Sequence, residues 1–249
     1  MKANYLKLFF VITLCLTIGS VEAQGLKSVL DKAKNALDEV GNKVKGDKND
    51  SEETVSAIAK PIAPDVKNSV SEIRSLTGLS EVDFEKKVKS MGFIKSTDET
   101  GFFGDQTIYK SKSKDYYIGI IMGTRGGELL TIEVSRISYK KNPVLTTMKS
   151  NFLNLAKQCT DLKAEFIDAD INESGKIIGG VRAKNLANRS SKFLPALDTM
   201  INSKKEFNAM ERYEERDYEY RVSFMNINAI ETGIVTVTVV DKTVDSQFG

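Results

Sequence analysis

The hydrophobic pattern begins with a short apolar run, Leu8 to Ile18, which follows Lys2 and Lys7 and precedes small residues. Val21 and Ala23 stand at the −3 and −1 positions of a signal-peptidase cleavage site. This arrangement is typical of a secretory signal peptide over residues 1–23. The run of about 11 residues is too short for a membrane-spanning helix, which needs roughly 20. We therefore expect an exported protein, periplasmic or extracellular, with no integral membrane segment after cleavage.

A second pattern, over residues 24–45, predicts an amphipathic helix separate from the rest of the chain. Its apolar positions recur at alternating spacings of four and three residues: Leu26, Leu30, Ala33, Leu37, Val40 and Val44. Three interpretations are open. The helix packs on its own domain, it self-associates or binds a partner helix, or it lies on a membrane surface. Leu26, Leu30, Leu37 and Val40 are therefore candidate partner-binding residues. Residues 46–64 are interpreted as a linker.

From residue 65 onward, helical patterns give way to strand patterns. Helices are expected over residues 65–76 and 80–91, the second with a capping box formed by Ser80 and Asp83 and with Gly92 at its end. Strands are expected at the following positions: 101–109, 115–122 and 128–138. The glycine-rich segment from Gly123 to Gly127 predicts a hairpin between the last two.

The remainder repeats this order of elements. The patterns predict helices over 145–159 and 190–202, a hairpin of 164–171 with 176–183, and closing strands over 206–213, 217–227 and 233–242. The expected fold class is α+β, with antiparallel sheet meanders and helices packed on one face, in a domain of residues 65–249. A helix followed by a strand meander occurs twice, at about 80–138 and 190–242, which makes 65–142 and 143–249 possible halves of the domain. The two units share element order but little residue identity, so duplication and coincidence both stay open.

Composition excludes several classes of chemistry. The chain has 36 Lys and Arg against 34 Asp and Glu, so its net charge of +2 gives no general attraction to nucleic acid. It contains no histidine, which rules out Ser-His-Asp and Cys-His catalysis and histidine-zinc sites. Signal cleavage would leave Cys159 as the single cysteine, in a helical pattern where we expect a buried thiol. No cofactor is predicted.

Asp168, Asp170 and Asn172 form the sharpest motif, because their oxygens match positions 1, 3 and 5 of an EF-hand calcium loop. The match then fails, since Glu173 replaces the required glycine and Gly179 replaces the bidentate glutamate. The alternative interpretation is a solvated strand that runs into a hairpin turn. The three residues are kept as a weak metal candidate.

A dense group of carboxylates forms the candidate catalytic set: Glu211, Glu214, Glu215, Asp217 and Glu219. Paired carboxylates perform general acid–base catalysis in glycosidases. Arginines alternate with these acids, however, and alternating signs at a strand junction are more typical of a solvated face with cross-strand ion pairs.

Phe102 and Phe103, between Gly101 and Gly104, are candidates for an exposed binding tip. The alternative is that they enter a strand and become half-buried. The basic residues around Arg182 and Arg189 are sparse and lack interleaved aromatics, so no nucleic-acid partner is expected.

The signal peptide, the segment Gln24 to Leu30 and the helix end before Phe93 together resemble small exported proteins of unknown function from Bacteroidetes-type bacteria. The resemblance implies a periplasmic or secreted location and no particular activity. The sequence thus predicts a non-enzymatic binding or interaction module, whose partner is an unidentified protein or small ligand, with self-association through residues 25–45 as one form. The alternative is a carboxylate-based hydrolase, with or without a metal.

Overall fold

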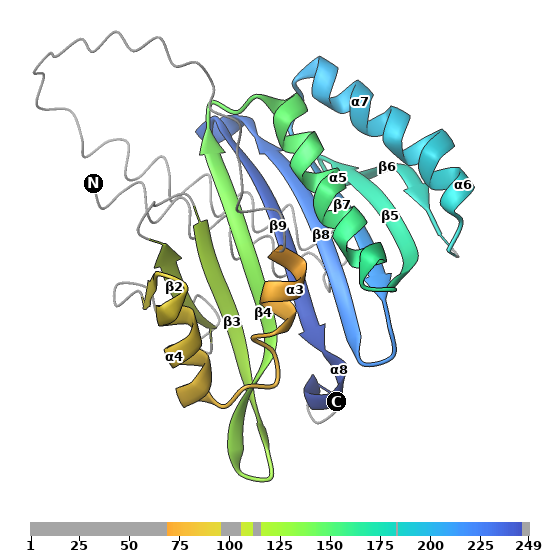
Figure 1. Cartoon of the computed structure of the whole chain (residues 1–249). Helices are drawn as coiled ribbons and strands as arrows, with labels where there is room; N and C mark the ends of the chain where they lie inside the picture. The colour runs from red at the N-terminus through yellow and green to blue at the C-terminus, as the bar shows by residue number, and fades with distance from the viewer. Residues whose placement is uncertain (1–68, 96–105, 112–115, 183, 246–249) are drawn as a thin grey trace, which may run out of the picture. The chain divides into compact units, whose positions relative to one another are not determined.

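The alternating apolar positions of the sequence pair into one antiparallel sheet in the computed structural model (Figure 1). Its strand order is β1-β2-β3-β4-β9-β8-β7-β5-β6. The strands are β1 (Phe93–Lys95), β2 (Gln106–Ser111), β3 (Tyr116–Arg125), β4 (Glu128–Lys141), β5 (Glu165–Glu173), β6 (Lys176–Val181), β7 (Phe207–Glu214), β8 (Tyr218–Ile227) and β9 (Thr232–Asp241). Strands β3, β4 and β7 to β9 lie where the sequence pattern predicts them.

The structure describes residues 69–95, 106–111, 116–182 and 184–245. The predicted signal peptide, amphipathic helix and linker, together with Phe102 and Phe103, lie outside these ranges. Predictions about them therefore stay predictions, as does the division of the chain into domains.

Helices cover one face of the sheet, the face toward the viewer in Figure 1. They are α3 (Ser69–Arg74), α4 (Glu81–Ser90), α5 (Leu145–Asp161) and a continuous segment made of α6 (Leu186–Asn188), the π-helix η2 (Arg189–Phe193) and α7 (Leu194–Ser203). A 3-10 turn, η3 (Asn228–Ile230), and a terminal turn, α8 (Lys242–Asp245), complete the described helices. This arrangement confirms the predicted α+β fold class.

Strands β4 and β9 join the first meander to the last. Their register runs from Glu133 opposite Val240 to Lys141 opposite Thr232. Every β9 residue is buried. The sequence predicts the two meanders but not this junction, because strand order depends on contacts between residues far apart in the chain.

Local signals explain where several elements begin and end. Ser80 caps α4, because its side chain accepts a hydrogen bond from the backbone N–H of Asp83, as the capping box predicts. The β3–β4 turn is narrower than predicted. Gly126 and Gly127, both with positive φ, make the turn, whereas Gly123 to Arg125 stay in the strand.

The last long helix begins earlier than the sequence predicts, at Leu186 instead of residue 190. Asn185 caps it by accepting a hydrogen bond from the N–H of Asn188. The wider π-helical turn η2 leads into α7 without a break, and Pro195 lies in the first turn of α7.

The core lies between the helices and the covered face of the sheet. Phe152 of α5 packs against Phe193 of η2 and Phe224 of β8, with ring centroids 6.3 and 6.2 Å apart. Cys159, also in α5, is buried as the helical pattern predicts, and burial raises the pKa of its thiol. The thiol therefore stays protonated and behaves as a small hydrophobic side chain.

Replacing Gly179 with alanine tests how closely the α6–η2–α7 segment approaches β6. Gly179 has a φ of +63°, and an added Cβ would lie 2.7 Å from the Cβ of Ala196. We expect Gly179→Ala to lower the free energy of unfolding by about 2–4 kcal/mol, measured by urea denaturation. Gly180→Ala is the matched control, because its Cβ would meet only the end of the Ile177 side chain, at 3.3 Å. Equal effects of the two substitutions would contradict this packing.

Candidate functional site

Glu211 is a fully buried carboxylate on the helix-covered face of β7. The alternation of β7 places Phe207, Ala209, Glu211 and Tyr213 on this face. Arg189, from η2, donates two hydrogen bonds to Glu211, from Nε to Oε1 at 2.7 Å and from Nη2 to Oε2 at 3.0 Å. The Tyr213 hydroxyl donates a third, 2.6 Å long, to Oε2. Glu211 is therefore charge-paired and hydrogen-bonded at both oxygens.

This cluster shifts the titration of its members. Burial, followed by the charge of Glu211, raises the pKa of Tyr213, so its hydroxyl remains a donor. Burial lowers the pKa of Arg189, but the hydrogen bond and charge of Glu211 outweigh burial and leave it raised.

Glu215 lies at the end of β7 and is held by residues of two other elements. Its Oε1 is 3.0 Å from Nη1 of Arg74, in α3, and also accepts a hydrogen bond from the Tyr220 hydroxyl. The same guanidinium lies over the ring of Tyr218, 4.4 Å from the ring centroid. Glu215 thus connects α3 to the β7–β8 hairpin.

Glu214 and Glu219 face each other across β7 and β8, on the side of the sheet away from the helices. They are the two members of the predicted catalytic set that the register brings together. Each has its own cation. Lys242 Nζ lies 2.6 Å from Glu214 Oε1, and Arg221 Nε lies 2.6 Å from Glu219 Oε1. The fifth member, Asp217, lies in the hairpin turn 3.8 Å from Arg216.

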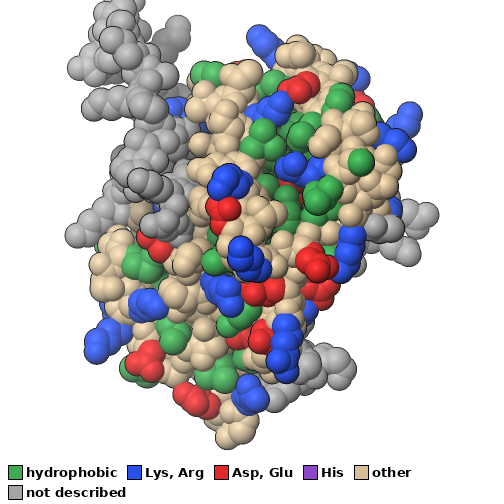
Figure 2. All heavy atoms as spheres, turned by 45° about the vertical axis from the view of Figure 1, so that its right-hand side comes forward, with side chains coloured by type: hydrophobic (Ala, Val, Ile, Leu, Met, Phe, Trp, Pro, Cys, Tyr) green, Lys and Arg blue, Asp and Glu red, His purple; other side chains and the backbone are tan. Residues whose placement is uncertain are grey.

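The predicted catalytic set is therefore distributed over both faces of the sheet and one turn, with a cation beside every carboxylate. Figure 2 shows the same mixing on the surface, where Lys and Arg side chains lie among Asp and Glu side chains and do not gather by sign. Partly exposed pairs of this kind contribute little to stability, about 0–1 kcal/mol each. They do, however, leave these carboxylates poorly suited to act as acid or base.

Asp168 and Asp170 lie side by side on the face of β5 away from the described helices, as alternation predicts, but their neighbours are arginines. Arg212 Nε donates to Asp168 Oδ1 at 2.8 Å, and Arg182 lies 3.3 Å from Asp168 and 3.4 Å from Asp170. The third member of the motif, Asn172, turns away. Its Oδ1 accepts a hydrogen bond from the N–H of Gly175 in the hairpin turn.

Two guanidinium groups thus occupy the positions where a calcium ion would need unopposed negative charge. Across the described ranges, no three Cys, Asp or Glu side chains form a group that could hold a metal ion. The motif forms an ion-paired strand and a hairpin turn, and Asp168 is buried instead of solvated.

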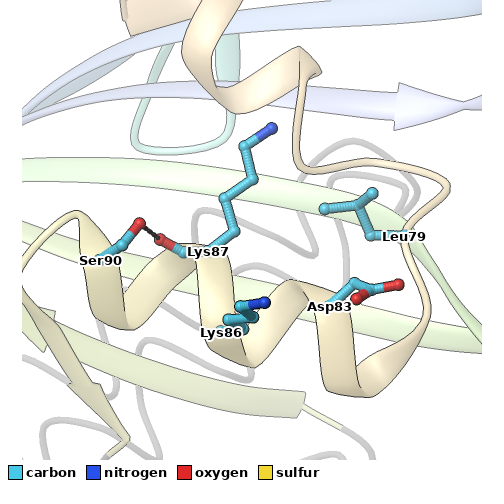
Figure 3. Close-up of a pocket in the computed structure, with 5 residues that line it drawn as sticks. All are labelled: Leu79, Asp83, Lys86, Lys87 and Ser90. Atoms are coloured by element: carbon cyan, nitrogen blue, oxygen red, sulfur yellow. Dashed lines mark hydrogen bonds between the residues drawn. The ribbon is translucent and has the colours of Figure 1, made fainter.

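A shallow cavity of about 360 Å³ lies between α4 and the loop before it (Figure 3). Its lining residues carry both charges: Leu79, Asp83, Lys86, Lys87 and Ser90. Lys87 Nζ donates to the backbone oxygen of Ser75, and the Ser90 hydroxyl donates to the backbone oxygen of Lys87. Because both groups are engaged with the backbone, the cavity offers no activated nucleophile.

Sequence reasoning missed the partners of the carboxylates, above all Arg189. One signal was present. Glu211 stands at an inward position of an alternating strand, between Ala209 and Tyr213, where a charge requires a buried partner. Which residue supplies it cannot be read from the sequence, because Arg189 lies 22 residues away on the π-helix.

Comparisons with known proteins leave the family open. No protein-family model matches the sequence, and no curated protein matches it. A match among solved structures is the Ran-binding protein Mog1p of Saccharomyces cerevisiae, which is 13% identical. The alignment covers 63% of this chain and 72% of that chain, with a TM-score of 0.25. A likeness at this level carries no conclusion about function. No helix within the described ranges is long and apolar enough to cross a membrane.

The titration of Asp170 supplies a test of the arginine cluster. Burial raises the pKa of Asp170, and the charge of Arg182 offsets this only in part. The folded state therefore holds this proton more tightly than the unfolded state, so the contribution of Asp170 to stability falls as pH rises above about 3.9. Asp170→Asn stays neutral throughout. We expect its stability relative to wild type to improve by about 1 kcal/mol or less between pH 3 and pH 7 in urea denaturation. If wild type instead gained stability relative to Asp170→Asn between pH 3 and pH 7, the assignment would be contradicted.

Proposed function

We propose that this chain is a non-enzymatic binding or interaction module, exported through the secretory pathway to the periplasm or the medium. The observation that supports it most directly is that each carboxylate of the 211–219 set already has a cationic partner. With histidine absent from the sequence, acid–base chemistry would have to depend on other side chains, and these residues are the densest group of carboxylates in the chain. The described part of the chain is a sheet covered by helices, which suits recognition of a partner better than catalysis.

The proposed exported location rests on the sequence. The signal-peptide pattern over residues 1–23 and the resemblance to small exported proteins of Bacteroidetes-type bacteria both support it. After cleavage, the chain would begin almost directly with the apolar seam of residues 25–45. We propose this seam as the site of self-association, because its period of about 3.5 residues is that of helices that pair with one another.

The rival function is a carboxylate hydrolase. The register brings Glu214 and Glu219 together, which is the one observation in its favour. Against it, Lys242 and Arg221 hold these two side chains, so a substrate would first have to displace both cations.

Substitution in the seam tests the proposed function. We expect the mature chain to form an oligomer that Leu30→Asp with Leu37→Asp converts to a monomer, measured by multi-angle light scattering. Lys27→Ser with Lys34→Ser, on the polar side of the same pattern, should leave the mass unchanged. Deletion of residues 24–46 should reproduce the monomer without changing the melting temperature of the rest.

Two results would count against the proposal. An unchanged mass in the Asp variants would remove self-association through the seam. Hydrolysis of a chromogenic glycoside that is lost in Glu214→Gln and Glu219→Gln, yet retained in the exposed control Glu81→Gln, would replace the binding module with the hydrolase.

A further inference from the structure

Strand β6 ends the described sheet, and its outer backbone edge is open. It pairs with β5 on one side, and no other described strand pairs with it (Figure 1). A strand in this position presents N–H and C=O groups that can pair with another chain. Proteins usually protect such edges with charges, bulges or a covering element.

The register identifies which groups point outward. Ser174 and Gly175, both with positive φ, form a two-residue turn that Glu173 and Lys176 close. The closing pair exchanges hydrogen bonds, so the next pair, Asn172 with Ile177, does not. The backbone N–H and C=O of Ile177 therefore point away from β5, and no described residue bonds to them. They are an unused donor and acceptor at the middle of the edge.

The side chains along this edge leave it accessible. The segment from η2 to α7 covers one face of β6, where the backbone oxygen of Lys192 lies within van der Waals distance of a Cβ placed on Gly179. The edge itself is lined by Ile177, 53% exposed, and by Gly180, which is also exposed and has no side chain. The register shift between β5 and β6 falls at Gly179 and Gly180, so the regular part of the edge runs only from Lys176 to Ile178. An incoming strand would find there the outward main-chain groups of Ile177 and one apolar side chain.

The charges beside β6 favour an acidic partner. Lys184 and Lys205 are paired with Glu165 and Glu173. Lys176 and Lys192 are exposed and have no acidic partner among the described residues. A second copy of this chain is a poor occupant, because it would bring its own Lys176 and Lys192 to an edge that already carries these two lysines.

We propose that β6 accepts an extended acidic segment of a partner protein as an additional antiparallel or parallel strand. The main chain of Ile177 supplies the hydrogen bonds, and Lys176 and Lys192 supply the selectivity for acidic side chains. This inference rests on the proposed binding function and names a partner class and a site for it. It does not depend on the seam of residues 25–45, so the two can fail separately.

The test uses the full mature chain and a fluorescein-labelled, end-blocked peptide of alternating Glu and Val, titrated by fluorescence anisotropy. Ile177→Pro removes the outward N–H without touching the ladder to β5, because proline is tolerated where the N–H faces outward from an edge strand. We expect it to weaken peptide binding at least about tenfold. Ile177→Thr, which keeps the N–H, should stay within about threefold of wild type.

Further measurements separate the contribution of the lysine charges to binding from that of backbone hydrogen bonds. Lys176→Ser with Lys192→Ser should weaken binding and reduce its salt dependence. A peptide with Lys in place of Glu should not bind. If Ile177→Pro fails to fold, as judged by circular dichroism, a probe N-methylated at alternate residues replaces it and should bind at least about tenfold more weakly.

Three outcomes would overturn the proposal. The first is no binding of the Glu-Val peptide to the wild-type chain. The second is equal binding by Ile177→Pro, or of the N-methylated probe. The third is a wild-type dimer that Ile177→Pro dissociates, which would make a second copy the occupant. The first two results would leave the light-scattering test of the seam unchanged. In the third, the mass would fall to that of the monomer in Ile177→Pro and would stay unchanged in the Leu30→Asp and Leu37→Asp variant, so the two proposals remain distinguishable.

Discussion

The ion pair between Arg189 and Glu211 is the interaction on which the arrangement of this fold depends. A carboxylate without solvent contact is costly to bury unless its charge is matched and both oxygens are hydrogen-bonded. Arg189 and Tyr213 meet that requirement for Glu211. Because Arg189 belongs to the π-helix η2, the pair fixes where the last long helix lies on the sheet. Phe193, four residues further on, then packs against Phe152 of α5 in the aromatic core.

Several other charged side chains of the described fold are also paired with a residue of opposite charge, and this pairing bears on function. Arg74 with Glu215, and Arg212 with Asp168, each join elements that are distant in sequence. Through these ion pairs, the acidic side chains connect strands to helices and to other strands. The chemistry left for a partner lies at the margins of the described fold, in the exposed backbone of β6 and the lysines beside it. This distribution of paired and unpaired charges supports the proposed recognition role.

Much of the fold could be predicted because periodicity is local. The stripe of Met148, Phe152 and Cys159 predicts α5, and the alternation in β7 to β9 predicts those strands. The β4–β9 junction could not be predicted, since either meander could have paired through another edge. The carboxylate set also depends on contacts between residues that are distant in the sequence. Its members could be found in the sequence, but the face of the sheet on which each lies and the cation beside it are determined by tertiary structure.

A double-mutant cycle on the buried pair tests most directly whether these carboxylates hold the fold together. Unfolding free energies would be measured by urea denaturation for Arg189→Met, Glu211→Met and the double variant. Arg189→Met leaves a buried charge unmatched and should cost about 3–5 kcal/mol, whereas the double variant should recover most of that loss. Small or simply additive costs would contradict the account, because they would mean that Arg189 and Glu211 do not depend on each other.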